Sequence, residues 1–367
     1  MEKKNLGGLL EEKENSDSLY ISKIKENRID SVDKITKIVN NSLDLDDTKV
    51  FRVGSKPEAL NYNVIPSGSL MLDYKLGVFG IPTGRIVHIY GKESSGKTTL
   101  ALKILANAQR MNYFTAFIDM EHAISLNWAK MVGIDIEQLI ISQPEFLEQA
   151  AEITEKLIDN DVKVIIIDSV AALVTKEELD NPYDKNSMAL IARGMSKFLR
   201  KINPKMSEKK ATIVFINQLR DNIGQMYGNP DITPGGRAIK FFSSISIGLR
   251  AGDKVDFSGD KTTSSEDIYG RELKFIISKN KVAPPLREGS FILNFDGKID
   301  NELELIEIAS HLNIVEQKGK WYQYKEQKFD GKKTFYKLIK ENRTIFDEIY
   351  NEVKNVVASN NNNLVLE

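Results

Sequence analysis

Residues 85–106 read RIVHIYGKESSGKTTLALKILA, and the segment 91–98 within them fits the phosphate-binding pattern G-x-x-x-x-G-K-[ST] at every fixed position. An apolar run precedes this segment and an apolar helical pattern follows it, so its glycines are expected in a turn between a strand and a helix. Such a turn curls backbone N–H groups around a phosphate, and the helix adds a favourable dipole. We therefore expect a nucleotide to bind at Gly91, Lys92, Glu93, Ser94, Ser95, Gly96, Lys97, Thr98 and Thr99.

Two side chains of this loop have specific expected roles. Lys97 would reach the β- and γ-phosphates, and the Thr98 hydroxyl would coordinate Mg²⁺. A chance glycine turn is the alternative, and the flanking strand and helix weigh against it. The loop predicts a nucleotide, but it does not show what the nucleotide is used for.

Length and composition limit the class of protein. The chain has 367 residues, enough for one large domain with appendages or for two domains, and 41% of them are hydrophobic. It has no cysteine, which excludes disulfides and thiolate chemistry. Its first residues are polar and no apolar run approaches membrane-spanning length, so we expect a cytoplasmic protein without a membrane partner. The 51 Lys and Arg residues nearly balance the 52 Asp and Glu residues. Any nucleic acid must therefore bind a local basic surface.

Strand and helix patterns alternate from about residue 64 to residue 296, which predicts an α/β core. The early strands are nearly continuous apolar runs, as is typical of parallel strands covered on both faces. The late strands follow one another closely and predict an antiparallel extension of a mostly parallel sheet. The expected strands are 86–90, 115–119, 164–168, 212–217, 245–249, 273–278 and 291–294.

Shorter segments flank this core. Residues 1–18 are polar and expected to be disordered, and residues 31–39 have the spacing of a short amphipathic helix. That helix could pack on its own core or on a neighbouring subunit, and the spacing alone leaves both open. Helical patterns at 302–311 and 345–357 predict a small α+β C-terminal domain. The predicted parts are 1–63, the core 64–296, the C-terminal domain 297–358 and a polar tail 359–367.

Carboxylates follow two of the predicted strands. Asp168 ends an apolar strand, which is the Walker-B arrangement for holding Mg²⁺; an Asp that caps the next turn is the alternative. Glu121 follows the strand 115–119, which we expect beside the nucleotide strand, and it could polarise the attacking water. Asp119 is ambiguous on the same grounds. His122 is more typical of a structural hydrogen bond than of a ligand.

An amide and a long loop follow a third strand. Gln218 comes after the strand 212–217, where an amide can contact a γ-phosphate and move when that phosphate leaves. The loop 219–233 is polar and glycine-bearing, and a loop of this length inside a core is usually functional or disordered. Basic and apolar residues on it suit backbone pairing and base stacking on nucleic acid: Arg220, Ile223, Met226 and Tyr227.

Five segments in order along the chain resemble a known family. They are GRIVHIYGKESSGKTTLALKILANAQ, FIDMEHA, VIIIDSVAALV, IVFINQLRDNIGQMYGNPDITPGGRAIKF and ISKNKVAPP. The chain resembles the bacterial RecA recombinases, ATPases that exchange DNA strands, from about residue 31 to residue 350. The resemblance implies a RecA-like core, ATP and Mg²⁺ as cofactors, and a helical homo-oligomeric filament on single-stranded DNA that pairs with homologous double-stranded DNA. It also implies a role in DNA repair and the SOS response, including self-cleavage of a LexA-type repressor.

The resemblance also implies a role for each matching residue. Lys97 and Thr98 match the phosphate and Mg²⁺ residues, Glu121 the carboxylate that activates water, Asp168 the Walker-B acid and Gln218 the γ-phosphate sensor. Lys279 and Lys281 match a pair that reaches ATP on the adjacent subunit, and the helix at 31–39 becomes the element that docks on a neighbour. The loops at about 180–194 and 219–233 match two DNA-binding loops, whose region adds Arg193, Arg200, Gly235 and Gly236.

Some positions depart from the family pattern. Ser125 stands where the family usually has an Asp that contacts adenine, and Trp128 replaces a Tyr that stacks on the base. These changes suggest looser base selectivity in a divergent, mobile-element type of member. Two alternatives remain open: a ring ATPase or helicase built on the same core, and a filament that acts mainly as a regulatory scaffold.

Overall fold

The computed structural model describes Lys34 and residues 63–180, 187–221, 231–232, 237–256, 261–263 and 268–363. The segment 1–18, most of the helix predicted at 31–39 and much of the loop 219–233 lie outside the described residues; Lys34 itself is helical. Within the described ranges, no helix is both long and apolar enough to cross a membrane.

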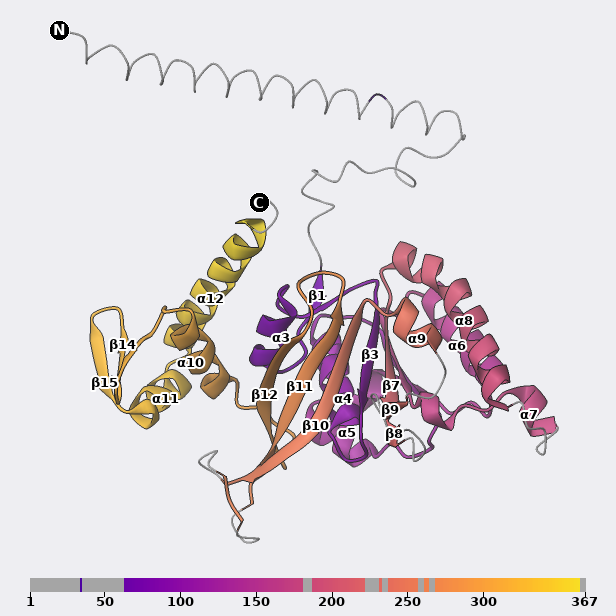
Figure 1. The fold of residues 1–367 in the computed structure, drawn as a ribbon, viewed down its shortest axis with the longest axis horizontal. Helices are drawn as coiled ribbons and strands as arrows, with labels where there is room; N and C mark the ends of the chain where they lie inside the picture. Colours follow the sequence, from indigo (N-terminus) through magenta and orange to yellow (C-terminus); the bar gives the residue numbers. More distant parts are fainter. Residues whose placement is uncertain are drawn as a thin grey trace. The chain divides into compact units, whose positions relative to one another are not determined.

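An eight-stranded mixed sheet organises the core, in the order β12-β11-β10-β3-β7-β6-β4-β5 (Figure 1). The six strands from β10 to β5 are parallel, and β11 and β12 extend the sheet antiparallel. This confirms the predicted fold class. The strands are β3 Ile86–Gly91, β4 Thr115–Asp119, β5 Leu139–Ser142, β6 Val164–Asp168, β7 Thr212–Gln218, β10 Ile245–Val255, β11 Gly270–Asn280 and β12 Arg287–Asn294.

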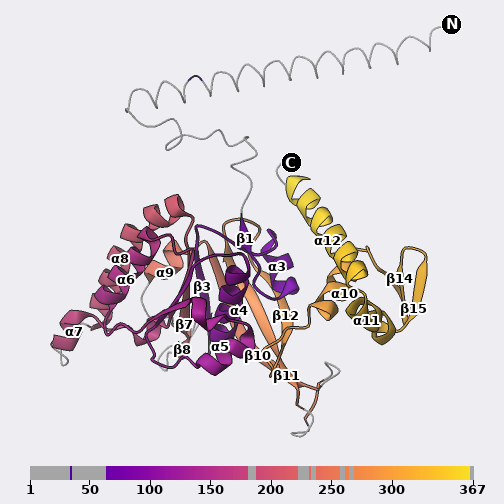
Figure 2. The same ribbon diagram turned by 180° about the vertical axis from the view of Figure 1, so that it is seen from behind.

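Helices cover both faces of this sheet because the central strands are buried on both sides (Figures 1 and 2). One apolar cluster joins one face to α3 Leu70–Leu76, α4 Lys97–Arg110 and α5 Leu126–Val132. A second cluster joins the other face to α6 Leu147–Asp159, α8 Ser187–Lys209 and α9 Arg237–Phe242. Alternate residues of β3 show the division, since Val87 and Ile89 belong to the first cluster and Ile86 to the second.

The strand order corrects one expectation. The strand before Glu121, β4, is not beside the nucleotide strand β3, because β7 and β6 lie between them. The neighbours of β3 are β7 and β10. The sequence alone cannot give this order. β3 and β7 are neighbours in the sheet, but β4, β5 and β6 lie between them along the chain. Glu121 can therefore reach the nucleotide strand only across the ends of two others.

The C-terminal part has a third apolar cluster of its own, to which α3 of the core also contributes contacts. Its elements are α10 Asn301–His311, β13 Glu316–Lys318, β14 Trp321–Tyr324, β15 Gln327–Asp330, α11 Lys332–Glu341 and α12 Arg343–Asn363. Outside these and the main sheet are β1 Val64–Ile65, β2 Ile81–Pro82, α7 Lys176–Asp180, β8 Arg220–Asp221 and β9 Asp231–Ile232, together with two short 3₁₀ turns. The three antiparallel strands among helices match the predicted α+β character.

Candidate functional site

The phosphate loop joins the end of β3 to the start of α4, and two glycines give it its shape. A Cβ atom at Gly91 would lie 2.3 Å from the carbonyl oxygen of Leu249 on the neighbouring strand. Gly96 has φ +84°, and a Cβ there would lie 2.4 Å from Leu273 Cδ1. At Gly91 the close atom belongs to the backbone and cannot move aside cheaply, and at Gly96 the positive φ favours glycine. The close approach leaves a cradle of backbone at the amino end of α4, the geometry that binds a phosphate.

Lys97 and Ser95 line this cradle with polar groups that suit an anion. Lys97 is 7% exposed, and its ammonium donates to the carbonyl oxygen of Lys92 at 2.7 Å. Burial lowers the pKa of Lys97, while Asp168, Glu121 and Glu93 act in the opposite direction. The Ser95 hydroxyl is buried without a hydrogen-bond partner. A buried hydroxyl left unpaired is costly, so the loop fits a phosphate that would satisfy it.

Asp168 lies at the end of β6, opposite the first turn of α4. Thr98 Oγ1 donates to Asp168 Oδ2 at 2.7 Å. Burial raises the pKa of Asp168 to about 6; Glu121 and Asp119 add to the rise, and the Thr98 hydrogen bond and Lys97 oppose it. No group of three or more potential metal-ligating side chains occurs in the part of the chain that the structure describes. A single carboxylate beside a hydroxyl fits Mg²⁺, which is usually held by one or two carboxylates together with substrate phosphates.

Glu121 is exposed and receives hydrogen bonds from two neighbouring strand ends. Gln218 Nε2 donates to Glu121 Oε1 at 2.8 Å, and the Ser169 hydroxyl donates to the same oxygen. Gln218 is the last residue of β7 and pairs in register with Gly91 of the phosphate loop. These contacts tie Glu121 to the end of β7, the strand beside the nucleotide strand, although β7 and β6 separate β4 from β3. Sequence reasoning missed Ser169, whose only signal was its position directly after Asp168.

Asp119 and His122 have structural surroundings. Asp119 is buried and accepts hydrogen bonds from the backbone of Ala123 and Ile124 and, at 3.0 Å, from Gln143 Nε2. These donors hold the carboxylate against the turn that follows β4 and against Gln143. His122 is exposed and has φ +55°, so it forms the turn after Glu121.

Trp128 lies on α5 next to the phosphate loop. Its indole Nε1 donates to Thr99 Oγ1 at 3.2 Å, one residue beyond the Mg²⁺ candidate Thr98. Ser125 is the N-cap of α5 and its hydroxyl accepts from the Trp128 backbone. The indole ring is therefore held beside the first turn of α4.

The expected intersubunit lysines lie at the end of β11. Lys279 Nζ donates to the carbonyl oxygens of Lys240 at 2.7 Å and Phe241 at 2.9 Å, in the last turn of α9. Burial, with the charge of Lys281 nearby, lowers the pKa of Lys279. Lys281 is exposed. The structure thus separates the two: Lys279 is attached to α9, whereas Lys281 extends from the surface.

The predicted DNA-contacting residues fall in three groups. Arg193 and Arg200 are exposed on α8, seven residues apart and so on one face of that helix. The backbone of Arg220 lies in β8, which pairs with β9. The other predicted residues, Ile223, Met226, Tyr227, Gly235 and Gly236, lie outside the described residues.

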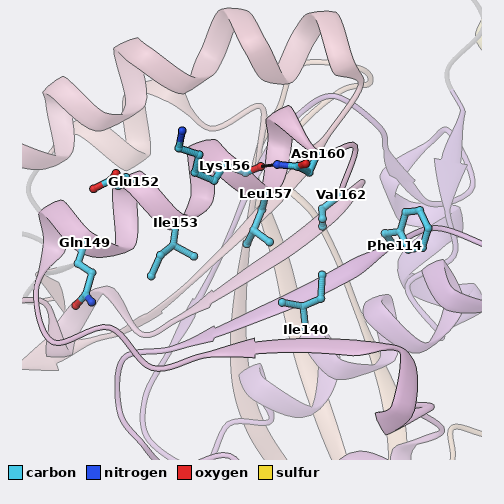
Figure 3. Close-up of a pocket in the computed structure, with 9 residues that line it drawn as sticks. All are labelled: Phe114, Ile140, Gln149, Glu152, Ile153, Lys156, Leu157, Asn160 and Val162. Atoms are coloured by element: carbon cyan, nitrogen blue, oxygen red, sulfur yellow. Dashed lines mark hydrogen bonds between the residues drawn. The ribbon is translucent and has the colours of Figure 1, made fainter.

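An apolar groove runs along the edge of the sheet between β5 and α6 (Figure 3). Ile153 and Leu157 point from α6 toward Ile140 on β5, which is 43% exposed, and Phe114 at one end is 66% exposed. Because β5 is the edge strand, its outer backbone groups have no strand partner within the sheet.

Comparison with known proteins finds two matching family models. A model of the RecA N-terminal domain matches residues 33–300, and a model of the RecA C-terminal domain matches residues 303–358. The chain belongs to the RecA family. Membership of this family confirms the resemblance. It also confirms the prediction that the protein is a recombinase and a DNA-dependent ATPase. Proteins of the RecA family bind DNA and form filaments.

Individual relatives agree with the domain matches. Protein RecA of Mesoplasma florum is 41% identical over 307 residues, which are 83% of this chain and 90% of that protein. Protein RecA of Caldanaerobacter subterraneus is 42% identical over the same share of this chain and 87% of its own length. Protein RecA of Streptococcus pneumoniae is 42% identical, with 78% of its length covered. The similarity therefore covers both the core and the C-terminal part.

Proposed function

We propose that this RecA-family chain hydrolyses ATP with Mg²⁺ at the phosphate loop, polymerises on single-stranded DNA and exchanges it with a homologous duplex. The observation that supports this most directly is the position of Gln218. It pairs with Gly91 of the phosphate loop, contacts Glu121, and is followed at once by the predicted DNA loop 219–233. One residue thus joins the nucleotide cradle, the catalytic carboxylate and the DNA-binding segment.

The residues of one subunit would act as follows. The backbone of the loop and Lys97 hold the β- and γ-phosphates, and Glu121 orients a water for attack on the γ-phosphorus. Thr98 and Asp168 would hold Mg²⁺, which neutralises charge on the phosphate oxygens. Asp168 must be ionised for this, and its raised pKa makes that step sensitive to acid. Trp128 would stack on the base.

We infer that the neighbouring subunit completes the site. Lys279 and Lys281 of one subunit would contact ATP held by the next, as an arginine finger does, with an effect of ~10³–10⁵ in rate. Turnover would then require the polymer, and head-to-tail contacts that do not close produce a helical filament. The groove between β5 and α6 supports this, because an apolar groove lined by Ile140 and Phe114 suits the apolar face of an amphipathic helix, such as the one predicted at 31–39 of a neighbour.

The DNA would lie along the filament axis, where basic side chains of many subunits align. Arg193, Arg200 and Arg220 would contact phosphates, and Ile223, Met226 and Tyr227 would stack on or insert between bases. Gly235 and Gly236 would let the backbone approach the strand. Self-cleavage of a LexA-type repressor on this filament stays a prediction from the resemblance.

The test is ATP hydrolysis with and without single-stranded DNA, together with electron microscopy of the ATP complex. We expect stimulation by DNA and an open helix. Turnover that is indifferent to DNA would contradict the proposal, and a closed ring would favour the helicase alternative. A strand-exchange assay with homologous and unrelated duplexes then separates recombination from simple polymerisation.

A further inference from the structure

Near its end, β11 contains a β-bulge that places Ile277 and Lys279, two residues apart, on opposite faces of the sheet. Ile247 of β10 pairs with Ile277, but the adjacent Ser246 pairs with Lys279, so Ser278 is an extra residue on β11. The bulge changes the alternation of the strand. Lys279 consequently reaches α9 on one face, although Ile277 belongs to the apolar cluster of the other face.

Asn280, the next residue, lies on the face that packs against α3. It pairs with Ile245, a member of the apolar cluster that includes α3. Its Nδ2 donates to the carbonyl oxygen of Leu76, in the last turn of α3, at 3.1 Å. Its Oδ1 accepts from the backbone N–H groups of Val282 at 3.0 Å and Ala283 at 3.2 Å. Asn280 therefore fixes the turn on both sides of Lys281.

Helix α3 is a firm support for this contact because both of its ends are held. At its start, the buried Glu304 of α10 accepts from Met71 N at 2.8 Å and from the Ser69 hydroxyl at 3.0 Å. At its end, Gly77 closes the helix in the left-handed conformation, and Arg287 donates to the Lys75 carbonyl oxygen at 3.4 Å. Movement of a turn tied to α3 would break the partly buried hydrogen bond between Asn280 and Leu76.

Lys281 depends on this turn for its position. Its side chain is exposed, and its backbone N–H donates to the Ser244 carbonyl oxygen at 2.9 Å. An exposed lysine side chain is flexible, so the positions that its ammonium group can reach are set by the backbone that carries it. That backbone is held by Asn280 on one side and by Ser244, the residue before β10, on the other.

We propose that Asn280 is a positioning residue for ATP hydrolysis: its amide ties the Lys281 turn to α3 and so aims Lys281 at the nucleotide of the adjacent subunit. This rests on the proposed intersubunit site. Asn280, which lies between the two lysines, would hold the turn in place, whereas the lysines would contact the nucleotide. A misplacement of about 1 Å at such a position costs up to ~10² in rate.

The test is Asn280→Asp in the full-length protein. The substitution keeps an oxygen for Val282 and Ala283 but replaces the donor to Leu76 by a carboxylate. The matched control is Asn107→Asp, which likewise removes an amide donor to a backbone carbonyl, that of Pro66, at 2.9 Å. We expect Asn280→Asp to lower DNA-stimulated kcat by roughly 10- to 100-fold, with KM for ATP changed by less than about twofold. Asn107→Asp should match the wild type.

Mixed filaments provide the readout that a merely structural defect would not give. An Asn280→Asp subunit keeps an intact phosphate loop, and an excess of Lys97→Ala subunits would supply it with a correctly placed Lys281. Turnover per Asn280→Asp subunit should therefore rise when Lys97→Ala protein, itself inactive, is added. If Asn280→Asp does not fold, Asn280→Ser, which also loses the contact with Leu76, carries the same test.

The outcomes separate this inference from the function on which it rests. Full activity of Asn280→Asp with an inactive Lys281→Ala protein would overturn the inference and leave the intersubunit site standing. Absence of rescue in mixed filaments would also overturn it. Full activity of Lys281→Ala would overturn the intersubunit site and the inference together.

Discussion

Gln218 Nε2 donates to Glu121 Oε1 at 2.8 Å, although the two residues come from strands that are not neighbours in the sheet. The amide holds the carboxylate that would orient the attacking water, and it is the residue that leads into the DNA loop. A Gln218 that turned toward a γ-phosphate would release Glu121. On the proposed function, this contact would link the state of the nucleotide to the predicted DNA loop 219–233.

Gln218→Ala should uncouple hydrolysis from DNA. The variant loses one hydrogen bond to a charged group, worth about 1.5–3 kcal/mol, so DNA-stimulated turnover should fall roughly 10- to 100-fold. The phosphate loop is untouched, and nucleotide affinity should stay close to that of the wild type. Steady-state ATPase assays with and without single-stranded DNA, with fluorescent nucleotide binding, check this. Equal DNA stimulation in both proteins would contradict it.

Acid should weaken Mg²⁺-dependent nucleotide binding through Asp168. Burial raises the pKa of this carboxyl to about 6, so protonation removes the anionic ligand below about pH 6. We expect the affinity for Mg²⁺–ATP to fall between pH 7 and pH 5, measured by titration in a constant-ionic-strength buffer. Asp168→Asn should bind weakly at every pH and lose this part of the pH dependence. If the affinity of Asp168→Asn for Mg²⁺–ATP fell between pH 7 and pH 5 as steeply as that of the wild type, another group would be responsible for the pH dependence.

The buried carboxyls of Asp73 and Glu304 should make the protein less stable as the pH rises. Burial raises the pKa of Glu304 from 4.5 to about 8, and Asp73 and Glu307 add to the rise; burial likewise raises the pKa of Asp73 from 3.8 to about 7. The folded protein holds these protons more tightly than the unfolded chain. The free energy of unfolding therefore decreases as pH rises, from full stabilisation below the unfolded pKa to its loss above about 8.

Glu304→Gln tests this linkage, since a neutral amide keeps an oxygen for Met71. The decrease in thermal midpoint between pH 6 and pH 9 should be smaller in the variant by roughly 2 °C or more. Glu326→Gln, at an exposed position of the C-terminal part, is the control and should follow the wild type. Parallel curves for Glu304→Gln and the wild type would assign the pH dependence elsewhere.

Ser125→Asp should increase the preference for ATP over GTP. Asp is as good an N-cap as Ser, so the start of α5 should be preserved. A carboxylate there would accept from the exocyclic amine of adenine and repel the carbonyl oxygen of guanine. The ratio of kcat/KM for the two nucleotides measures the effect. An unchanged ratio would place base recognition elsewhere, for example in Trp128.

The sequence was sufficient where structure is set by continuous local patterns. The strands 115–119 and 164–168 were predicted at both ends because each is a buried, mostly apolar run that ends in an aspartate. The edge strand β5 was missed, since three of its four residues are partly or fully exposed and its pairing with β4 is not local. The Glu121–Gln218 contact and the bulge at Ser278 depend on strand order and register, which no local pattern contains.

The groove along β5 provides the last prediction, on assembly. Ile140 lines the groove and Ile141, on the opposite face of the same edge strand, does not, although both are partly exposed at 43% and 38%. Ile140→Asp would place a charge in the surface that we expect a neighbour to cover, whereas Ile141→Asp adds the same charge outside it. Burying an unpaired carboxylate is unfavourable by several kcal/mol, so Ile140→Asp should raise the protein concentration needed for filaments by ~10-fold or more. Light scattering and electron microscopy on single-stranded DNA measure this. Equal effects of the two variants would show that the groove is not an assembly surface.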